Sequence, residues 1–205
     1  MKKYFALLLL NFLVPLAAWE TLGYQECCKT YSIEGNIGYF HPFSKSLRRV
    51  ISGGVNYQLL TTYKWNQNFG LFLGADYFHK NGRSTGSHSG TSLNIVPITI
   101  GIKGSIDICN FCDESGLQAY FLLGPRWYYV NSKNSPNYMP RHNYAHGFGG
   151  MGGVGIAYLY RNFLFNLVVN FSFGNVSTHT SKKHIHTPNT QVGGIFAGGG
   201  IGYSF

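Results

Sequence analysis

Eight segments in which apolar and polar residues alternate run from residue 31 to residue 205, and this alternation limits the fold more than any other feature of the chain. Residues that repeat with a period of two lie on the same face of a β-strand. Clusters of Gly, Asn, Ser and Pro, which favour turns, separate the segments. The segments that we expect to form strands are 31–40, 54–63, 69–78, 92–106, 117–130, 148–160, 163–174 and 192–205.

The two faces of each expected strand differ in chemistry. In the seventh segment Phe165, Leu167 and Phe171 share one face, whereas Asn166 and Asn170 share the other. A soluble β-sandwich would place charged residues on its wet face, but the chain is only 11% charged, against about 25% in an average soluble domain. The alternation therefore predicts a bulky apolar face toward lipid and a face of Gly, Asn and Thr toward a narrow, filled lumen.

Composition argues against two other classes of protein. Apolar residues are never gathered into a run of about 20, the length that a membrane-spanning helix needs. Asp and Glu total only seven residues, which is few for the charged surface of a helical soluble enzyme. Segments of about ten residues, in contrast, are long enough for tilted strands to cross a bilayer.

The N-terminus has the pattern of a secretory signal peptide, because Lys2 and Lys3 precede a short apolar stretch that small residues follow. We expect cleavage after Ala18 or, alternatively, after Gly23; a buried N-terminal helix is the other interpretation. The predicted boundaries are 1–18 for the signal peptide, 19–29 for a short periplasmic N-terminal segment and 30–205 for a transmembrane barrel. This organisation predicts a location in the bacterial outer membrane.

The connections between the expected strands alternate in length. The shorter connections are 64–68, 107–116 and 161–162, and the longer ones are 41–53, 79–91, 131–147 and 175–191. Outer-membrane barrels have short periplasmic turns and long outer loops. The sequence therefore predicts an all-β fold: a closed eight-stranded antiparallel transmembrane β-barrel, an up-and-down meander with four long outer loops and short periplasmic turns.

The last segment ends in Gly202, Tyr203, Ser204 and Phe205, so that a terminal aromatic residue follows alternating apolar positions. Together with the signal peptide and the eight segments, this ending resembles the small eight-stranded outer-membrane β-barrel proteins of Gram-negative bacteria, of the OmpA-barrel, OmpX and OmpW type. The resemblance covers residues 30–205 and implies that the barrel-assembly machinery recognises the strand that ends in Phe205. It does not imply one activity, because the family includes adhesins, small-solute pores and enzymes.

Charge is distributed unevenly along the predicted barrel. The four outer loops contain nine basic residues and no Asp or Glu, which accounts for the whole formal net charge of +9. We call these nine residues the basic outer cap: Lys45, Arg48, Arg49, Lys80, Arg83, Lys133, Arg141, Lys182 and Lys183. Such a cap attracts polyanions, and we expect lipopolysaccharide and host-surface polyanions as partners; the alternative is that it only neutralises the anionic outer leaflet. Nucleic acid is not expected, because no basic groove with interleaved aromatic residues is visible.

Four charged residues fall on the lumen face by alternation, namely Glu34, Asp76, Lys103 and Arg126. A charge inside a narrow barrel has to be paired. The strand directions place Asp76 and Arg126 in the outer half and the other two in the periplasmic half. Two acids and two bases predict either a static plug of salt bridges or a gate in which the partners exchange to let ions pass.

Histidines are concentrated in the outer loops. Imidazoles are common ligands of zinc and copper, and the candidates for a metal site are His142, His146, His179, His184 and His186. Zinc requires three or four ligands in tetrahedral geometry, which loop positions do not ensure. The alternative is that these histidines are ordinary polar loop residues, and we expect no cofactor.

All four cysteines, which are Cys27, Cys28, Cys109 and Cys112, are expected on the periplasmic side. The oxidising periplasm favours disulfides, and we prefer one or two bridges that join the N-terminal segment to the second turn. Four cysteines allow three pairings. A zinc site of four thiolates and crosslinks between chains are the alternatives.

No set of residues with catalytic spacing is visible. Ser87, His88 and Ser89 lie together, but no outer loop contains an acid that would complete a triad. The leading hypothesis is therefore a non-enzymatic structural or surface-interaction protein whose basic outer cap binds a polyanionic glycolipid or glycan. A narrow small-solute or ion pore of the OmpW type is the alternative, and an outer-membrane lipid-modifying enzyme is the third hypothesis.

Overall fold

The structure, a computed structural model, describes residues 31–50, 52–66, 68–83, 90–112, 115–134, 142–178 and 190–205. Within these ranges the chain is almost entirely strand, with one short helix. The elements are β1 (Tyr31–Pro42), α2 (Lys45–Val50), β2 (Gly54–Lys64), β3 (Phe69–Arg83), β4 (Gly90–Cys112), β5 (Ser115–Asn134), β6 (His142–Tyr160), β7 (Phe163–Thr178), β8 (Thr190–Gln191) and β9 (Gly194–Ser204). No helix of the described part is long and apolar enough to cross a membrane.

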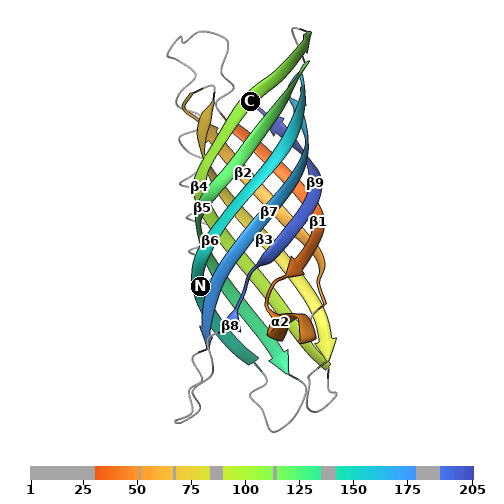
Figure 1. Ribbon diagram of the computed structural model, residues 1–205, viewed down its shortest axis with the longest axis vertical. Coiled ribbons are helices and arrows are strands. Elements are labelled where there is room, and N and C mark those ends of the chain that lie inside the picture. The colour runs from red at the N-terminus through yellow and green to blue at the C-terminus, as the bar shows by residue number, and fades with distance from the viewer. Residues whose placement is uncertain are drawn as a thin grey trace.

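The strands form one closed antiparallel sheet. Each strand from β1 to β7 pairs with the next, β9 pairs with both β7 and β1, and the pairing of β6 with β7 completes the ring. The two-residue strand β8 and the strand β9 both pair with β7 and together occupy the eighth position in the wall. The predicted eight-stranded up-and-down barrel is therefore confirmed, with strongly tilted strands and α2 at the end opposite the C-terminus (Figure 1).

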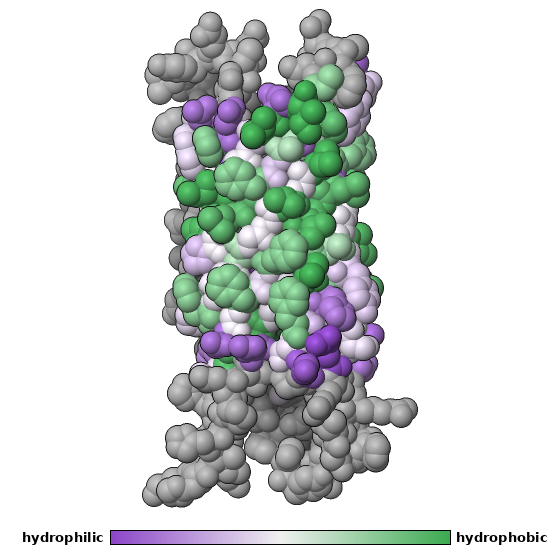
Figure 2. Space-filling model, viewed as in Figure 1, coloured by the Kyte–Doolittle hydropathy of each residue, from purple (hydrophilic) through white to green (hydrophobic). Residues whose placement is uncertain are grey.

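The two faces of the wall have the chemistry that the alternation predicts. On β7 the outward side chains of Leu167 and Phe173 are each 70% exposed, whereas the inward Asn166, Val168 and Asn170 are buried. The outer surface carries a broad apolar band that is bordered by hydrophilic residues at both ends (Figure 2). A wall of this kind matches the hydrocarbon core of a bilayer with water on either side.

Apolar side chains fill much of the interior in two clusters. One cluster occupies the middle of the barrel and consists of Leu60, Phe72, Tyr120, Leu122, Met151, Ala157, Leu164, Val168 and Phe196. The other lies toward the end that carries α2 and consists of Leu47, Phe78, Leu93, Ile95, Tyr128, Val130, Ala145, Val176 and Val192. An eight-stranded barrel is just wide enough for side chains to fill it, and buried polar groups occupy the remaining lumen positions.

Two of the strands extend into the predicted periplasmic connection 107–116. β4 continues to Cys112 and β5 begins at Ser115, so the predicted connection 107–116 is mainly a β-hairpin, and Cys109 lies in a strand rather than in a turn. Register shifts between Asp107 and Cys109, and between Asn110 and Cys112, explain the error. A β-bulge inserts a residue and breaks the period of two, although the strands remain paired.

The outer connections also differ from the prediction, because strands extend into all four of them. Strand β3 continues to Arg83, β6 already begins at His142, and connection 41–53 contains the helix α2. These outer extensions carry polar outward residues, such as the exposed His79 and Asn81. The period of two does not predict these extensions, because a strand that leaves the lipid no longer needs an apolar face.

Proline interrupts the wall at two places. Between β3 and β4 the pairing passes from Ala75 and Ile98 to Phe78 and Ile95, without the pair that would include Pro97. Between β4 and β5 it is interrupted in the same way next to Pro125. Proline has no backbone N–H to donate to a ladder, which explains both gaps.

Gly155 of β6 lies where the ring of Tyr120 crosses the lumen, and a Cβ at this position would come within 2.6 Å of the carbonyl oxygen of Leu167. We expect Gly155→Ala to lower the free energy of unfolding by about 1–3 kcal/mol, because it overpacks the wall. Urea unfolding of the barrel refolded in lipid vesicles measures this change. Gly152→Ala on the same strand is the matched control, because its nearest neighbour would lie at 3.8 Å; an equal loss in both variants would contradict the steric argument.

Candidate functional site

The periplasmic half of the lumen contains an ion pair between Lys103 of β4 and Glu34 of β1. The Glu34 carboxylate is completely buried. Its Oε2 accepts a 2.9 Å hydrogen bond from Nδ2 of Asn166, and the Ser32 hydroxyl donates to its Oε1 at 3.4 Å. Nζ of Lys103 also lies 4.6 Å from the ring centre of Tyr120, a cation–π distance. Both charges are therefore compensated by several partners.

A second ion pair joins Arg126 of β5 to Asp76 of β3 in the outer half of the lumen. Nε of Arg126 donates a 2.8 Å hydrogen bond to the hydroxyl of Thr99. The other carboxylate oxygen of Asp76, Oδ1, is buried and has no hydrogen-bond partner among the residues that the structure describes. The structure thus brings the four lumen charges together as two separate pairs, each within the half to which the strand directions assigned it.

Three amide side chains form a polar layer in the lumen that the sequence analysis missed. Oε1 of Gln58 accepts hydrogen bonds from Nδ2 of Asn36 at 3.2 Å and from Nδ2 of Asn170 at 3.3 Å. On neighbouring strands, Gln58 pairs with Asn36 on one side and with Asp76 on the other. Alternation places all three amides on the lumen face, and this is the sequence signal by which they can be found.

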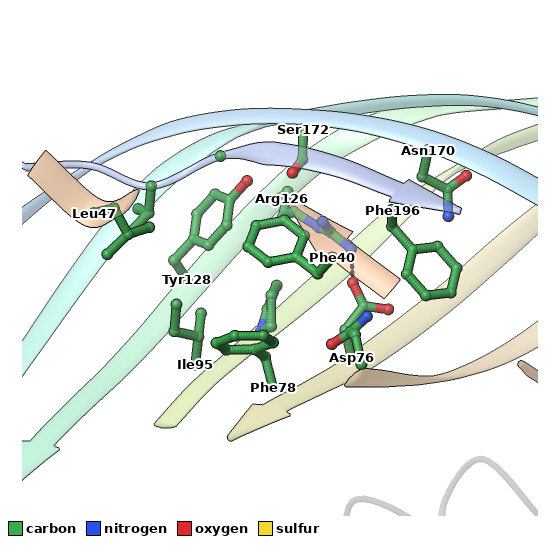
Figure 3. Close-up of a pocket in the computed structure, with 14 residues that line it drawn as sticks. Phe40, Leu47, Asp76, Phe78, Ile95, Arg126, Tyr128, Asn170, Ser172 and Phe196 are labelled. Carbon is green, nitrogen blue, oxygen red and sulfur yellow. Dashed lines mark hydrogen bonds and ion pairs between the residues drawn. The ribbon is translucent and has the colours of Figure 1, made fainter. Parts of the chain in front are cut away.

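The enclosed space beside the Asp76–Arg126 pair is small. A cavity of about 20 Å³ is lined there by Asp76, Arg126, Asn170 and Ser172, with Leu47 and Tyr128 among the apolar residues toward the outer mouth (Figure 3). A cavity needs about 10–15 Å³ to hold one water molecule. This part of the lumen therefore has room for about one water and not for a solute.

The helix α2 packs against the inside of the barrel at its outer end. Leu47 of this helix is only 7% exposed and belongs to the outer apolar cluster, where it packs among strand residues such as Phe78, Ile95 and Tyr128. The pattern of connection 41–53 predicts a loop, whereas the structure has the helix α2 there. The single leucine between basic residues is the only sequence signal for it.

The residues of the basic outer cap lie on several elements. Lys45 and Arg48 are exposed on α2, and Arg49 belongs to the same helix. Lys80 and Arg83 lie on β3 and Lys133 on β5. The remaining three, which are Arg141, Lys182 and Lys183, lie outside the described residues.

The two described histidine candidates, His142 and His146, belong to no group of metal ligands in the described part of the chain. His142 and His146 belong to strand β6 rather than to a loop, and the ring of His146 lies 5.4 Å from that of Tyr129 and 6.3 Å from that of Trp127. The other three candidates, His179, His184 and His186, lie outside the described part. Across the described residues no group of three or more potential metal ligands is present.

The structure describes two of the four cysteines, Cys109 and Cys112. Cys109 is exposed and has no disulfide partner among the described residues. Cys112 is the last residue of β4, and Cys27 and Cys28 lie outside the described part. The disulfide between the N-terminal segment and the second hairpin therefore stays a prediction.

Comparison with solved structures identifies the class of fold. The barrel is similar to the outer membrane protein OprG from Pseudomonas aeruginosa, with a TM-score of 0.60 and 15% identity over 87% of this chain and 96% of that chain. It is also similar to Ail, the attachment invasion locus protein of Yersinia pestis, with a TM-score of 0.51 and 12% identity over 87% of this chain and 100% of that chain. The N-terminal β-barrel domain of Pseudomonas aeruginosa OprF gives a TM-score of 0.50 and 15% identity over 86% of this chain and 98% of that chain.

The chain thus has the fold of the small eight-stranded outer-membrane β-barrels, as the sequence resemblance implied. The predicted location in the bacterial outer membrane agrees with these likenesses and with the apolar outer wall. No protein-family model matches the sequence, and no curated protein matches it. At such low identity the solved structures show the fold alone, so the activity has to be argued from the site.

Lys103→Met removes the partner of the buried Glu34 carboxylate while it keeps the length of the side chain. We expect a loss of about 3–5 kcal/mol in the free energy of unfolding, because an unpaired charge then remains in the lumen. The double variant E34Q/K103M removes both charges and should recover most of this loss. Urea unfolding of the single and double variants in vesicles measures this double-mutant cycle. Losses of unfolding free energy that simply add would show that the two side chains do not stabilise each other.

Proposed function

We propose that this protein is a surface-interaction barrel of the outer membrane whose basic outer cap binds a polyanionic glycolipid or glycan. The observation that carries the proposal is the segregation of charge. The outer connections contain nine basic residues and no acid. Of the acids that the structure describes, Glu34 and Asp76 are buried in ion pairs and Asp107 lies in the hairpin of β4 and β5.

The filled lumen supports a binding role over a transport role. Two ion pairs, an amide layer and two apolar clusters occupy the interior, and Leu47 of α2 adds to the outer cluster. A barrel filled in this way presents only its outer end to large molecules outside the cell. Unbalanced positive charge at that end raises the local concentration of anions and speeds their association.

The ligands that this surface fits are saccharides that carry phosphate or sulfate groups. Lipopolysaccharide of the surrounding leaflet is one source, and a sulfated polymer on a host surface is the other. The alternative interpretation, in which the cap only neutralises the outer leaflet, gives no saturable binding. The expectations that the chain is not an enzyme, does not bind nucleic acid and is recognised by the barrel-assembly machinery through Phe205 stay predictions.

Binding of heparin and of lipopolysaccharide to the refolded barrel should be saturable and should weaken steeply with salt. Between about 50 and 200 mM NaCl we expect the affinity to fall at least about tenfold, because exposed charges are screened and counterions are released. Titration calorimetry at several salt concentrations measures this dependence, with neutral dextran as the control. Absent binding, or binding that does not respond to salt, would refute the proposal.

A narrow pore of the OmpW type is the second candidate, and the interruption of the wall beside Pro97 is the observation that favours it. Pro97 and Asp76 both line the small cavity, so the gap in the β3–β4 ladder lies next to the outer ion pair. If the two ion pairs exchanged partners, the lumen would gain space for ions. In this case the basic cap would act mainly to select anions.

Single-channel recording separates the two candidates. We expect the wild-type barrel in planar bilayers to show no steady conductance, because ion pairs and apolar side chains block its lumen. The variant D76N/R126M, which removes both charges of the outer ion pair, should remain closed as well, because the apolar clusters still fill the lumen. Steady openings of the wild type would establish the pore and contradict the static plug.

A further inference from the structure

The helix α2 is fixed to the barrel on both sides. Before the helix, the backbone N–H of Phe43 donates a 2.9 Å hydrogen bond to the carbonyl oxygen of Gly193. After it, the Tyr39 hydroxyl donates to the carbonyl oxygen of Ser52 at 3.5 Å, and Gly53 turns the chain into β2 with a φ of +112°. A residue with a side chain would be strained at that φ. The helix therefore has a defined place at the outer mouth.

The two sides of α2 differ in chemistry. Successive residues of a helix are rotated by about 100°, so Lys45 and Arg48 lie about 60° apart on one side and Leu47 lies roughly opposite Lys45. The exposures agree, because Leu47 is buried in the outer apolar cluster whereas both basic side chains are exposed. The apolar residue thus anchors the helix and turns its basic side outward.

A third cation, Lys80, lies close to the connection that carries α2. Lys80 of β3 is half-buried, and its Cδ lies 3.4 Å from the position that a Cβ of Gly54 would occupy. Gly54 is the first residue of β2 and follows Gly53 directly. Lys80 therefore lies beside the point where the chain leaves the α2 connection and enters β2. The outer connections contain no acid that would neutralise these three charges.

We propose that α2 is the polyanion-binding element of the basic outer cap, with Lys45 and Arg48 as the contacts, Lys80 as a flanking contact and Leu47 as the positioning residue. The ligand is a saccharide with phosphate or sulfate groups, since two cations one helical turn apart match anionic groups that are spaced along a chain. This inference rests on the proposed function and narrows it to one element. A fixed helix binds with a smaller entropic loss than a surface that has to be ordered first.

The test uses the complete barrel refolded in phosphatidylcholine vesicles, with heparin as the sulfated probe and purified lipopolysaccharide as the phosphorylated one. We expect K45Q/R48Q to raise the dissociation constant for both probes at least about tenfold, and to reduce its salt dependence. A loss for heparin alone would identify sulfated glycans as the ligand, and a loss for lipopolysaccharide alone would identify the phosphorylated glycolipid. Heat-dependent gel mobility verifies that each variant folds.

Two controls carry the same change in net charge. K64Q/R161Q removes two basic residues of the periplasmic rim, and K182Q/K183Q removes two from the connection that follows β7; neither should change the affinity more than about twofold. An equal loss in K182Q/K183Q would show that binding is spread over the cap and would overturn the assignment to α2. Binding by the wild type together with an unchanged K45Q/R48Q would overturn it as well, while the proposed function would stand. Absent binding by the wild type would refute both.

The positioning role of Leu47 is tested with substitutions that leave the net charge unchanged. Leu47→Ala leaves every cation in place, and we expect a dissociation constant several times higher with an unchanged salt dependence, because the helix loses its anchor. Leu47→Met, which conserves the volume, should restore the affinity. If Leu47→Ala binds as the wild type does, Leu47 does not position the site.

Discussion

The constraint on which this structure depends is that lipid offers no hydrogen bonds. Every backbone N–H and C=O within the bilayer has to find a partner in the protein, and a sheet can achieve this only by closing on itself. The pairing of β9 with both β1 and β7 provides this closure. Pairing is interrupted beside Pro97 and Pro125, but the residues on either side of each gap continue the ladder in register. Closure of the sheet is therefore kept.

Closure with eight strands then determines what the interior has to contain. The lumen is too narrow for bulk water, so an inward charge without a partner is costly. Glu34 has three such partners in Lys103, Asn166 and Ser32, and Gln58 binds two amides at once. The two ion pairs are thus a consequence of burial, since either charge alone would be strongly destabilising.

The features that sequence could predict are those that repeat. Alternation identified the lipid-facing residues, the eight strands and the four charged residues of the lumen, because a period of two survives wherever one face has to be apolar. It failed where this requirement ends: at the bulges near Cys109, and in the outer extensions such as His79 to Arg83. The helix α2 could not be predicted for another reason, because six residues are too few to form a stable helix alone. Contacts with the barrel hold them in place, among them the burial of Leu47 and the hydrogen bond from Phe43 to Gly193.

Burial in the filled barrel also explains why the proposed binding residues lie on α2. The sequence alone indicates only that the outer connections are basic. An outer loop that merely joined two strands would have no reason to turn a basic side outward, and its cations would be spread over many conformations. Here the open end of a filled barrel supplies an apolar pocket for one leucine, and the hydrogen bond from Phe43 to Gly193 sets the direction from which the chain approaches it. Burial of Leu47 then determines where Lys45 and Arg48 can lie. The interior that we expect to block transport thus also orients the proposed binding surface, which links the filled lumen to the basic outer cap.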